Sequence, residues 1–187
     1  GVKKLCYVSS VATLSTLPHT PIDEENDWNN EDNNTDYAIS KHGAEMEVWR
    51  GSQEGLPVVI VNPSVVLGGD FADRGSGLLY KKVADGLRYY PAGATGFVGV
   101  DDVVRAMVQL QFSEVVGERF VLNAENLTYK AVLERIANQL GVKAPTKRVS
   151  HQMLRFLARL DGVLSFLHLK KRTLTLASAD ALGTVTT

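Results

Sequence analysis

Four stretches of the chain carry the hydrophobic patterns that predict β-strands. Leu5–Val8 is a short apolar run that ends in two serines, and residues 56–67 are β-branched and almost continuously apolar. A continuous run of this kind is typical of a strand buried on both faces of a parallel sheet. Residues 97–100 and 119–123 are shorter runs that predict two further strands.

Amphipathic stretches with capping residues predict helices between and after these strands. Their limits, with the capping residue where one is evident, are 36–50 (Thr35 or Asp36), 78–87, 102–112 (Asp101 or Asp102), 129–141 (Thr128) and 150–169. The first helix connects two apolar strands, which predicts a β-α-β unit with a right-handed crossover. The pattern therefore predicts an α/β fold with a parallel sheet.

Composition narrows the class of protein. The chain has 187 residues, 44% of them hydrophobic and 22% charged, with a formal net charge of −1. This balance argues against disorder and against a nucleic-acid binder, which would carry a basic excess. The single cysteine, Cys6, excludes an internal disulfide and fits a reducing compartment. With no apolar run long enough for a membrane span, we expect a cytoplasmic protein without a membrane-spanning segment.

Residues 18–36 predict a loop. This segment has seven acidic residues and five asparagines but no lysine or arginine. Such a charge run is most often a solvated surface, and a loop beside the substrate is the alternative.

Tyr37 and Lys41 are spaced so that they share one face of the first predicted helix. A free tyrosine side chain has a pKa of about 10 and is a poor base at neutral pH. A cation fixed a few ångströms from a phenol favours the phenolate, which can then exchange a proton with a substrate hydroxyl or carbonyl. Alone, however, the Tyr-x-x-x-Lys pattern is common by chance.

The surrounding segments make the pattern specific. Residues 4–14 (KLCYVSSVATL), the pair Tyr37 and Lys41, residues 57–68 (PVVIVNPSVVLG) and residues 97–103 (FVGVDDV) occur in this order. Together they resemble the extended short-chain dehydrogenases/reductases, in particular the dihydroflavonol-reductase-like branch of the NAD-dependent epimerase/dehydratase family. The resemblance implies the second half of a Rossmann-like doubly wound parallel sheet, interleaved with substrate segments over residues 1–112. Residues 113–187 would then be mainly a small substrate-binding part and a tail.

The resemblance also implies roles for individual residues. Ser10 would orient the substrate oxygen, Tyr37 would transfer the proton, and Lys41 would assist the tyrosine and hold the nicotinamide ribose. Ser9 is the alternative to Ser10. The nicotinamide itself would lie against a segment of four residues, which are Pro63, Ser64, Val65 and Val66.

Gly93, Gly96 and Gly99 have the Gly-x-x-Gly-x-x-Gly spacing of a dinucleotide-binding loop. Such a loop must follow an apolar strand directly, whereas Arg88-Tyr89-Tyr90-Pro91 precedes these glycines. In relatives the loop also lies upstream of the Tyr-x-x-x-Lys pair. We therefore predict a structural role for the three glycines: a turn, a strand and the start of a helix. Because the chain opens with Gly1 and enters an apolar run at Leu5, we expect that an N-terminal portion is missing.

The remaining patterns carry less chemistry. The four histidines, at positions 19, 42, 151 and 168, have no metal-ligand spacing, so no metal site is expected. The stretch 150–169 predicts a helix that packs on the core or over a substrate cleft, with a membrane-surface helix as the alternative. The Tyr37 helix could form a homodimer contact, as it does in many relatives.

These observations favour an oxidoreductase that uses NAD or NADP to reduce a ketone or oxidise an alcohol. A nucleotide-sugar epimerase is the first alternative, although residues 62–69 lack the Gly-Pro pair that is usual there. A non-catalytic NAD(P)-binding or scaffold protein is the second. If the dinucleotide-binding loop is missing, this chain alone should bind NAD(P) poorly and be inactive.

Overall fold

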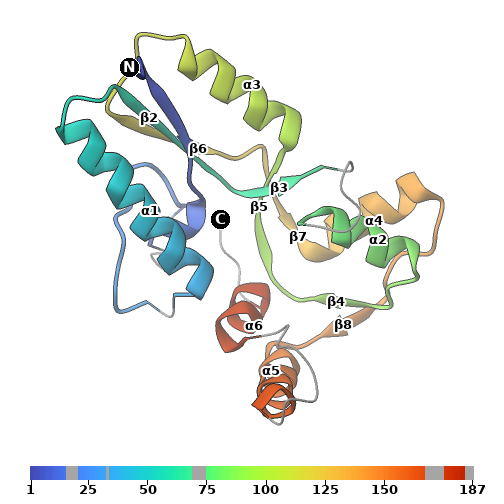
Figure 1. Ribbon diagram of the computed structural model, residues 1–187. Coiled ribbons are helices and arrows are strands. Elements are labelled where there is room, and N and C mark those ends of the chain that lie inside the picture. The colour runs from blue at the N-terminus through green and yellow to red at the C-terminus, as the bar shows by residue number, and fades with distance from the viewer. Residues whose placement is uncertain (16–20, 33, 69–74, 167–174, 184–187) are drawn as a thin grey trace. The chain divides into compact units, whose positions relative to one another are not determined.

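The computed structural model describes residues 1–15, 21–32, 34–68, 75–166 and 175–183 (Figure 1). Residues 18–20 and 33 of the predicted acidic loop and residues 167–169 of the predicted helix 150–169 lie outside these ranges. The chain divides into two compact units. Unit 1 comprises residues 1–68 and 96–125, and unit 2 comprises residues 69–95 and 126–187. The predicted division at residue 112 separates a nucleotide-binding part from a substrate-binding part, and it stays a prediction.

Unit 1 is built on a three-stranded parallel sheet in the order β1-β2-β6. Its strands are β1 (Leu5–Val8), β2 (Val58–Pro63) and β6 (Glu118–Leu122). The central strand β2 is buried along its whole length, as its continuous apolar run predicts. The first strand, the α/β class and the parallel sheet are therefore confirmed.

Two helices pack on this sheet, one on each face (Figure 1). The first is α1 (Asp36–Gln53), which begins at the Thr35 cap and continues three residues beyond the predicted end at Arg50. The second is α3 (Val100–Gln111). Gly99 is its N-cap and the two aspartates lie in its first turn, so the predicted cap at Asp101 or Asp102 is wrong by two or three residues. Lys4 binds the C-terminal end of this helix, because its ammonium donates to the carbonyls of Leu110 and Ser113 at 2.5 and 2.8 Å.

The predicted single strand 56–67 is in fact two strands. β2 ends at Pro63, and β3 (Val65–Leu67) follows after Ser64. β3 belongs to a second sheet, in which β5 (Ala94–Gly99) lies between β3 and β7 (Glu125–Thr128). Sequence pattern could not separate the strands because both are apolar and only one residue divides them. Residues 63–66 therefore form the bend at which the chain leaves the first sheet.

The glycine run lies in a strand. Gly96 and Gly99 belong to β5 (Ala94–Gly99), which pairs in parallel with β3, and the helix α3 starts directly after Gly99. A side-chain Cβ at Gly96 would lie only 2.4 Å from the Asn123 side-chain oxygen. Close packing of strand ends therefore explains this glycine, which confirms its predicted structural role.

Unit 2 contains short strands and helices. Its helices are α2 (Gly77–Ala84), α4 (Tyr129–Leu140), α5 (His151–Phe166) and α6 (Leu176–Gly183). The strands β4 (Tyr89–Pro91) and β8 (Lys147–Val149) pair in parallel, and β7 (Glu125–Thr128) leads into α4. Thr128 caps α4 and the helix ends at Gly141, both as predicted. Gly141 adopts the left-handed conformation that commonly ends a helix. Leu154 and Ala158 of α5 are buried with Ala179 of α6, so α5 packs on a core, in line with the first of the two alternatives for this helix.

Candidate active site

The predicted catalytic residues come from segments that meet at one edge of the first sheet. Parallel strands end at the same edge, and Val8, the last residue of β1, pairs with Val61 near the end of β2. Beyond the strand, the amide of Ser9 still donates to the Val61 carbonyl at 2.8 Å. In α/β sheets, ligands bind outside the carboxyl ends of the strands, which is the position of this edge.

Ser10 begins the short 3-10 helix η1 (Val11–Thr13) directly after β1. Its side-chain oxygen accepts a hydrogen bond from the amide of Ala12 at 3.2 Å. Its carbonyl accepts one from the side-chain amide of Asn62 at 3.1 Å. The side chain is partly exposed, so its hydroxyl proton is available to a ligand at the sheet edge.

Ser9 has a different environment. The residue is buried, and its hydroxyl donates to the carboxylate of Glu45. A hydroxyl has a single proton to donate, and here that proton is used inside the fold. The geometry therefore favours Ser10 over Ser9 as the residue that faces a substrate.

Lys41 is held at the end of β1 by a direct contact. Its ammonium donates to the carbonyl of Val8 at 2.6 Å and lies 5.0 Å from the centre of the Tyr7 ring. Tyr37 lies one helical turn earlier on α1, in the first turn after the Thr35 cap, and is 59% exposed. The fold thus brings Lys41 to the segment that carries Ser10, with the phenol of Tyr37 on the same helix face as Lys41.

The bend between β2 and β3 carries the four residues expected to line the nicotinamide. Pro63 and Ser64 are buried, whereas Val65 is exposed and Val66 is partly buried. The Ser64 hydroxyl is buried and has no hydrogen-bond partner among the described residues. Buried hydroxyls usually have a partner, so this one suits the polar group of a ligand.

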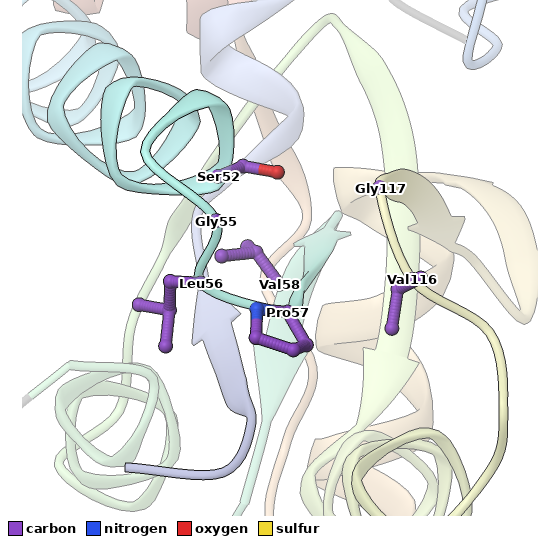
Figure 2. Close-up of a pocket in the computed structure, with 7 residues that line it drawn as sticks. All are labelled: Ser52, Gly55, Leu56, Pro57, Val58, Val116 and Gly117. Carbon is purple, nitrogen blue, oxygen red and sulfur yellow. The ribbon is translucent and has the colours of Figure 1, made fainter. Parts of the chain in front are cut away.

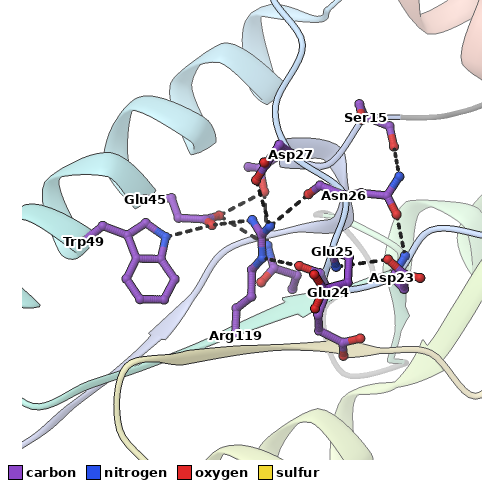
Figure 3. Close-up of polar contacts among 11 residues, drawn as sticks. Ser15, Asp23, Glu24, Glu25, Asn26, Asp27, Glu45, Trp49 and Arg119 are labelled. Carbon is purple, nitrogen blue, oxygen red and sulfur yellow. Dashed lines mark hydrogen bonds and ion pairs between the residues drawn. The ribbon is translucent and has the colours of Figure 1, made fainter.

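Sequence reasoning missed the centre of polar contacts beside these residues. Glu45, on α1, is 1% exposed and binds donors from several segments of unit 1 (Figure 3). We call this set the Glu45 cluster, and its members are Ser9, Thr13, Glu45, Trp49, Asn62 and Arg119. One signal was available in the sequence: Glu45 continues the helical spacing of Tyr37 and Lys41 by one further turn.

The acidic segment before α1 is tied to the sheet of unit 1 through Arg119 of β6 (Figure 3). The Arg119 guanidinium donates to the carbonyls of Glu24 and Asn26 at 2.9 and 3.0 Å. In addition, the Trp28 ring stacks on the His42 ring with the centroids 4.3 Å apart. The described part of the predicted loop therefore lies against β6 and α1, with its carboxylates largely exposed.

Cys6, in the middle of β1, is not suited to nucleophilic chemistry. Burial raises the pKa of its thiol, an effect that the charge of Lys4 only partly offsets. The thiol is therefore neutral at physiological pH.

A shallow pocket of about 260 Å³ lies at the opposite edge of the sheet (Figure 2). Its lining residues surround the start of β2, and they are Ser52, Gly55, Leu56, Pro57, Val58, Val116 and Gly117. These residues offer no titratable side chain, so the pocket has no evident chemistry. Among the described residues, no group of histidine, cysteine or acidic side chains could hold a metal ion. No helix in the same ranges is long and apolar enough to cross a membrane.

Comparison with known proteins gives this arrangement a context. The model of the NAD-dependent epimerase/dehydratase family matches residues 1–123. The chain is 26% identical to sterol demethylase protein B of Methylococcus capsulatus, over 92% of this chain and 53% of that protein. It is 32% identical to tetraketide alpha-pyrone reductase 2 of Arabidopsis thaliana, over 55% of this chain and 33% of that protein. The chain thus spans at most about half the length of these curated relatives.

Among solved structures, a nucleoside-diphosphate-sugar epimerase from Pseudomonas aeruginosa superposes with a TM-score of 0.76. The two chains are 28% identical, and the match covers 85% of this chain and 53% of the other. The match therefore supports a Rossmann-like α/β fold and covers about half of the other chain.

Proposed function

The chain belongs to the NAD-dependent epimerase/dehydratase family, and on this premise we propose that it carries the catalytic residues of an NAD(P)-dependent oxidoreductase acting on a ketone or an alcohol. The observation that carries the proposal is the contact between Lys41 and the Val8 carbonyl. It places the Tyr-x-x-x-Lys helix against the strand end that leads into Ser10. A chance Tyr-x-x-x-Lys pattern would have no reason to meet a serine at the carboxyl edge of a parallel sheet.

The proposed roles follow from what each group can donate or accept. Tyr37, exposed at the start of α1, gives its phenolic proton to a carbonyl oxygen or removes one from an alcohol. Lys41 uses one of its three ammonium protons on Val8, which leaves two for a ribose hydroxyl and for the phenolate. The Ser10 hydroxyl donates to the same substrate oxygen and fixes its position.

The residues at this edge fit a nicotinamide cofactor. Among the described residues, the Ser64 hydroxyl has no partner and Lys41 uses only one of its protons, so both can donate to a ligand. The exposed side chain of Val65 adds an apolar surface at the bend. When bound, the cofactor supplies or accepts the hydride at the substrate carbon. Relatives of the chain are about twice as long, and Gly96 and Gly99 lie in a strand. We therefore propose that residues 1–187 alone bind NAD(P) weakly.

A substitution of Tyr37 tests the proposal. In a form of the protein extended to the length of its relatives, reduction of a panel of aliphatic and aromatic ketones is followed by the loss of NAD(P)H absorbance. Removal of a general acid costs about 10²–10⁴-fold in rate, so Tyr37→Phe should abolish turnover of any ketone that the parent protein reduces. The matched control is Tyr89→Phe, another exposed tyrosine, which should keep full activity. Equal activity in Tyr37→Phe and in the parent would refute the catalytic assignment.

An epimerase is the second candidate, favoured by the similarity to the Pseudomonas aeruginosa nucleoside-diphosphate-sugar epimerase. Epimerisation involves no net consumption of NAD(P)H, so the two candidates separate in one experiment. Conversion of a nucleotide sugar without a change in NAD(P)H absorbance would support the epimerase, and ketone-dependent loss of absorbance would support the reductase. A cytoplasmic location and a homodimer remain proposals for the whole protein.

A further inference from the structure

Glu45 is buried, yet it lies on the helix face that carries the proposed catalytic pair. Its Oε2 atom receives the Ser9 hydroxyl, lies 2.9 Å from the Thr13 hydroxyl and accepts from the Asn62 amide at 3.2 Å. A carboxylate can only accept hydrogen bonds, and every group in contact with Oε2 here can donate one. The Thr13 hydroxyl lies equally close, at 2.9 Å, to the Ser10 carbonyl. The set of contacts therefore suits a carboxylate.

The contacts at Oε2 enclose Ser10 on both sides. Ser9 precedes it, and Thr13 closes the short helix that Ser10 begins. The side-chain amide of Asn62 connects Ser10 with Glu45, because it donates to the Ser10 carbonyl at 3.1 Å and also contacts the Glu45 carboxylate. The backbone around Ser10 is thus held by three residues that all contact the same carboxylate.

The second oxygen ties the carboxylate to the rest of unit 1 (Figure 3). Oε1 accepts from the Trp49 indole at 3.3 Å and lies 3.8 Å from the Arg119 guanidinium. Arg119, which is 18% exposed, belongs to β6 and also holds the acidic segment. The cluster therefore connects α1 with the ends of β1 and β2 and with β6.

Lys41 lies one turn before Glu45, and Tyr37 lies two turns before it. Because Glu45 anchors α1 to the strand ends, it sets the position along α1 at which Lys41 reaches the Val8 carbonyl. We propose that Glu45 is a positioning residue, whose buried carboxylate holds Ser10 and the Tyr37–Lys41 pair in one arrangement at the sheet edge. This inference rests on the proposed function for its catalytic meaning, although the positioning itself can be measured without activity.

The test compares Glu45→Gln with the matched control Glu47→Gln. Both remove one carboxylate from α1, but Glu47 is exposed and contacts only Arg50 among the described residues. The first readout is the rate at which acetic anhydride modifies Lys41, measured by mass spectrometry relative to the exposed Lys82. In Glu45→Gln, the NH₂ group of the new side chain would face the groups that now donate to the carboxylate, so α1 would shift. The contact of Lys41 with the Val8 carbonyl would then weaken, and labelling of Lys41 should rise several-fold. In Glu47→Gln, labelling of Lys41 should not change.

The second readout uses the extended form of the protein that serves for the Tyr37→Phe test. It is kcat for a ketone that this form reduces, measured on folded protein well below its melting temperature. A positioning role predicts a loss of at least tenfold in kcat with little change in the KM for NAD(P)H. A purely structural role predicts a lower melting temperature with unchanged kcat and unchanged Lys41 labelling, and that result would overturn the inference. If labelling rises but kcat does not fall, the positioning stands and the proposed role of Lys41 fails.

A milder variant keeps the test informative if Glu45→Gln does not fold. Thr13→Val preserves the side-chain volume but removes the hydroxyl that contacts Oε2, the Ser10 carbonyl and the Asn62 amide. It should raise Lys41 labelling in the same direction by a smaller factor. Unchanged labelling in a folded Thr13→Val protein would contradict the proposal.

Discussion

A glycine-to-alanine change is expected to have opposite effects at two positions of unit 1. Gly96 lies in β5, where an added Cβ would be 2.4 Å from the Asn123 side-chain oxygen and 3.0 Å from the Cβ of Ser64. Gly43 lies inside α1, where an added Cβ would meet no atom within 4 Å. The same methyl group is therefore too large for one site and harmless at the other.

The magnitudes follow from these surroundings. At Gly96 either Asn123 must move or β5 must shift away from its neighbours in the sheet, and forced overpacking of this kind costs about 1–3 kcal/mol. At Gly43 the methyl group reduces the entropy of the unfolded chain and improves helix propensity, which stabilises by about 0.5–1 kcal/mol. We expect Gly96→Ala to destabilise unit 1 and Gly43→Ala to stabilise it.

Urea unfolding followed by tryptophan fluorescence measures both changes. The two tryptophans of the chain, Trp28 and Trp49, belong to unit 1, so the signal reports this unit. With a denaturant slope of about 1.5 kcal/mol per M, a loss of about 2 kcal/mol lowers the midpoint by about 1.3 M, and the gain at Gly43 raises it by roughly 0.3–0.7 M. An unchanged midpoint in Gly96→Ala, with a selective loss of NAD(P)H affinity, would show that Gly96 belongs to a cofactor loop and not to a packed strand.

Three further changes are expected to have measurable effects. Thr128→Ala removes the bond to the Ala131 amide at the start of α4 and should destabilise unit 2 by about 1 kcal/mol, measured by circular dichroism. Because burial raises the pKa of Cys6, a thiol reagent at pH about 8 should modify Cys6 several-fold more slowly in the folded protein than in the urea-unfolded protein. Burial also raises the pKa of Tyr129, so its contribution to stability is intact below pH about 10 and is lost as the pH rises further. A Tyr129→Phe protein should lack this part of the alkaline decline in melting temperature.

Much of unit 1 could be predicted because its elements are long or strongly patterned. The buried strand β2 and the capped helix α1 follow from a continuous apolar run and from a threonine at the right position. The elements that the sequence did not reveal are short and weakly patterned. Thus β4 has only three residues, β8 has two basic residues among three, and α6 is rich in small residues. Their structure depends on pairing with distant segments, which local periodicity does not encode.

The candidate site was only partly visible in the sequence for a similar reason. Tyr37 and Lys41 are close along one helix, so their relation follows from spacing alone. Glu45 has the sequence character of a surface residue, since α1 as a whole is polar and a glutamate is seldom buried. Its burial depends on donors from β1, η1, β2 and β6, and only the folded chain brings these together.

The parallel sheet of unit 1 has a consequence for the order in which the chain can fold. Leu5 pairs with Val58, and Val59 pairs with Glu118, so every contact of the sheet joins distant parts of the sequence. Such non-local pairing closes large loops and slows folding. During synthesis, the apolar β2 leaves the ribosome with its second edge unpaired until β6 follows, after the first segment of unit 2 has already been made. In the interval between β2 and β6 the nascent chain therefore carries an apolar strand with an unpaired edge, and such edges favour aggregation.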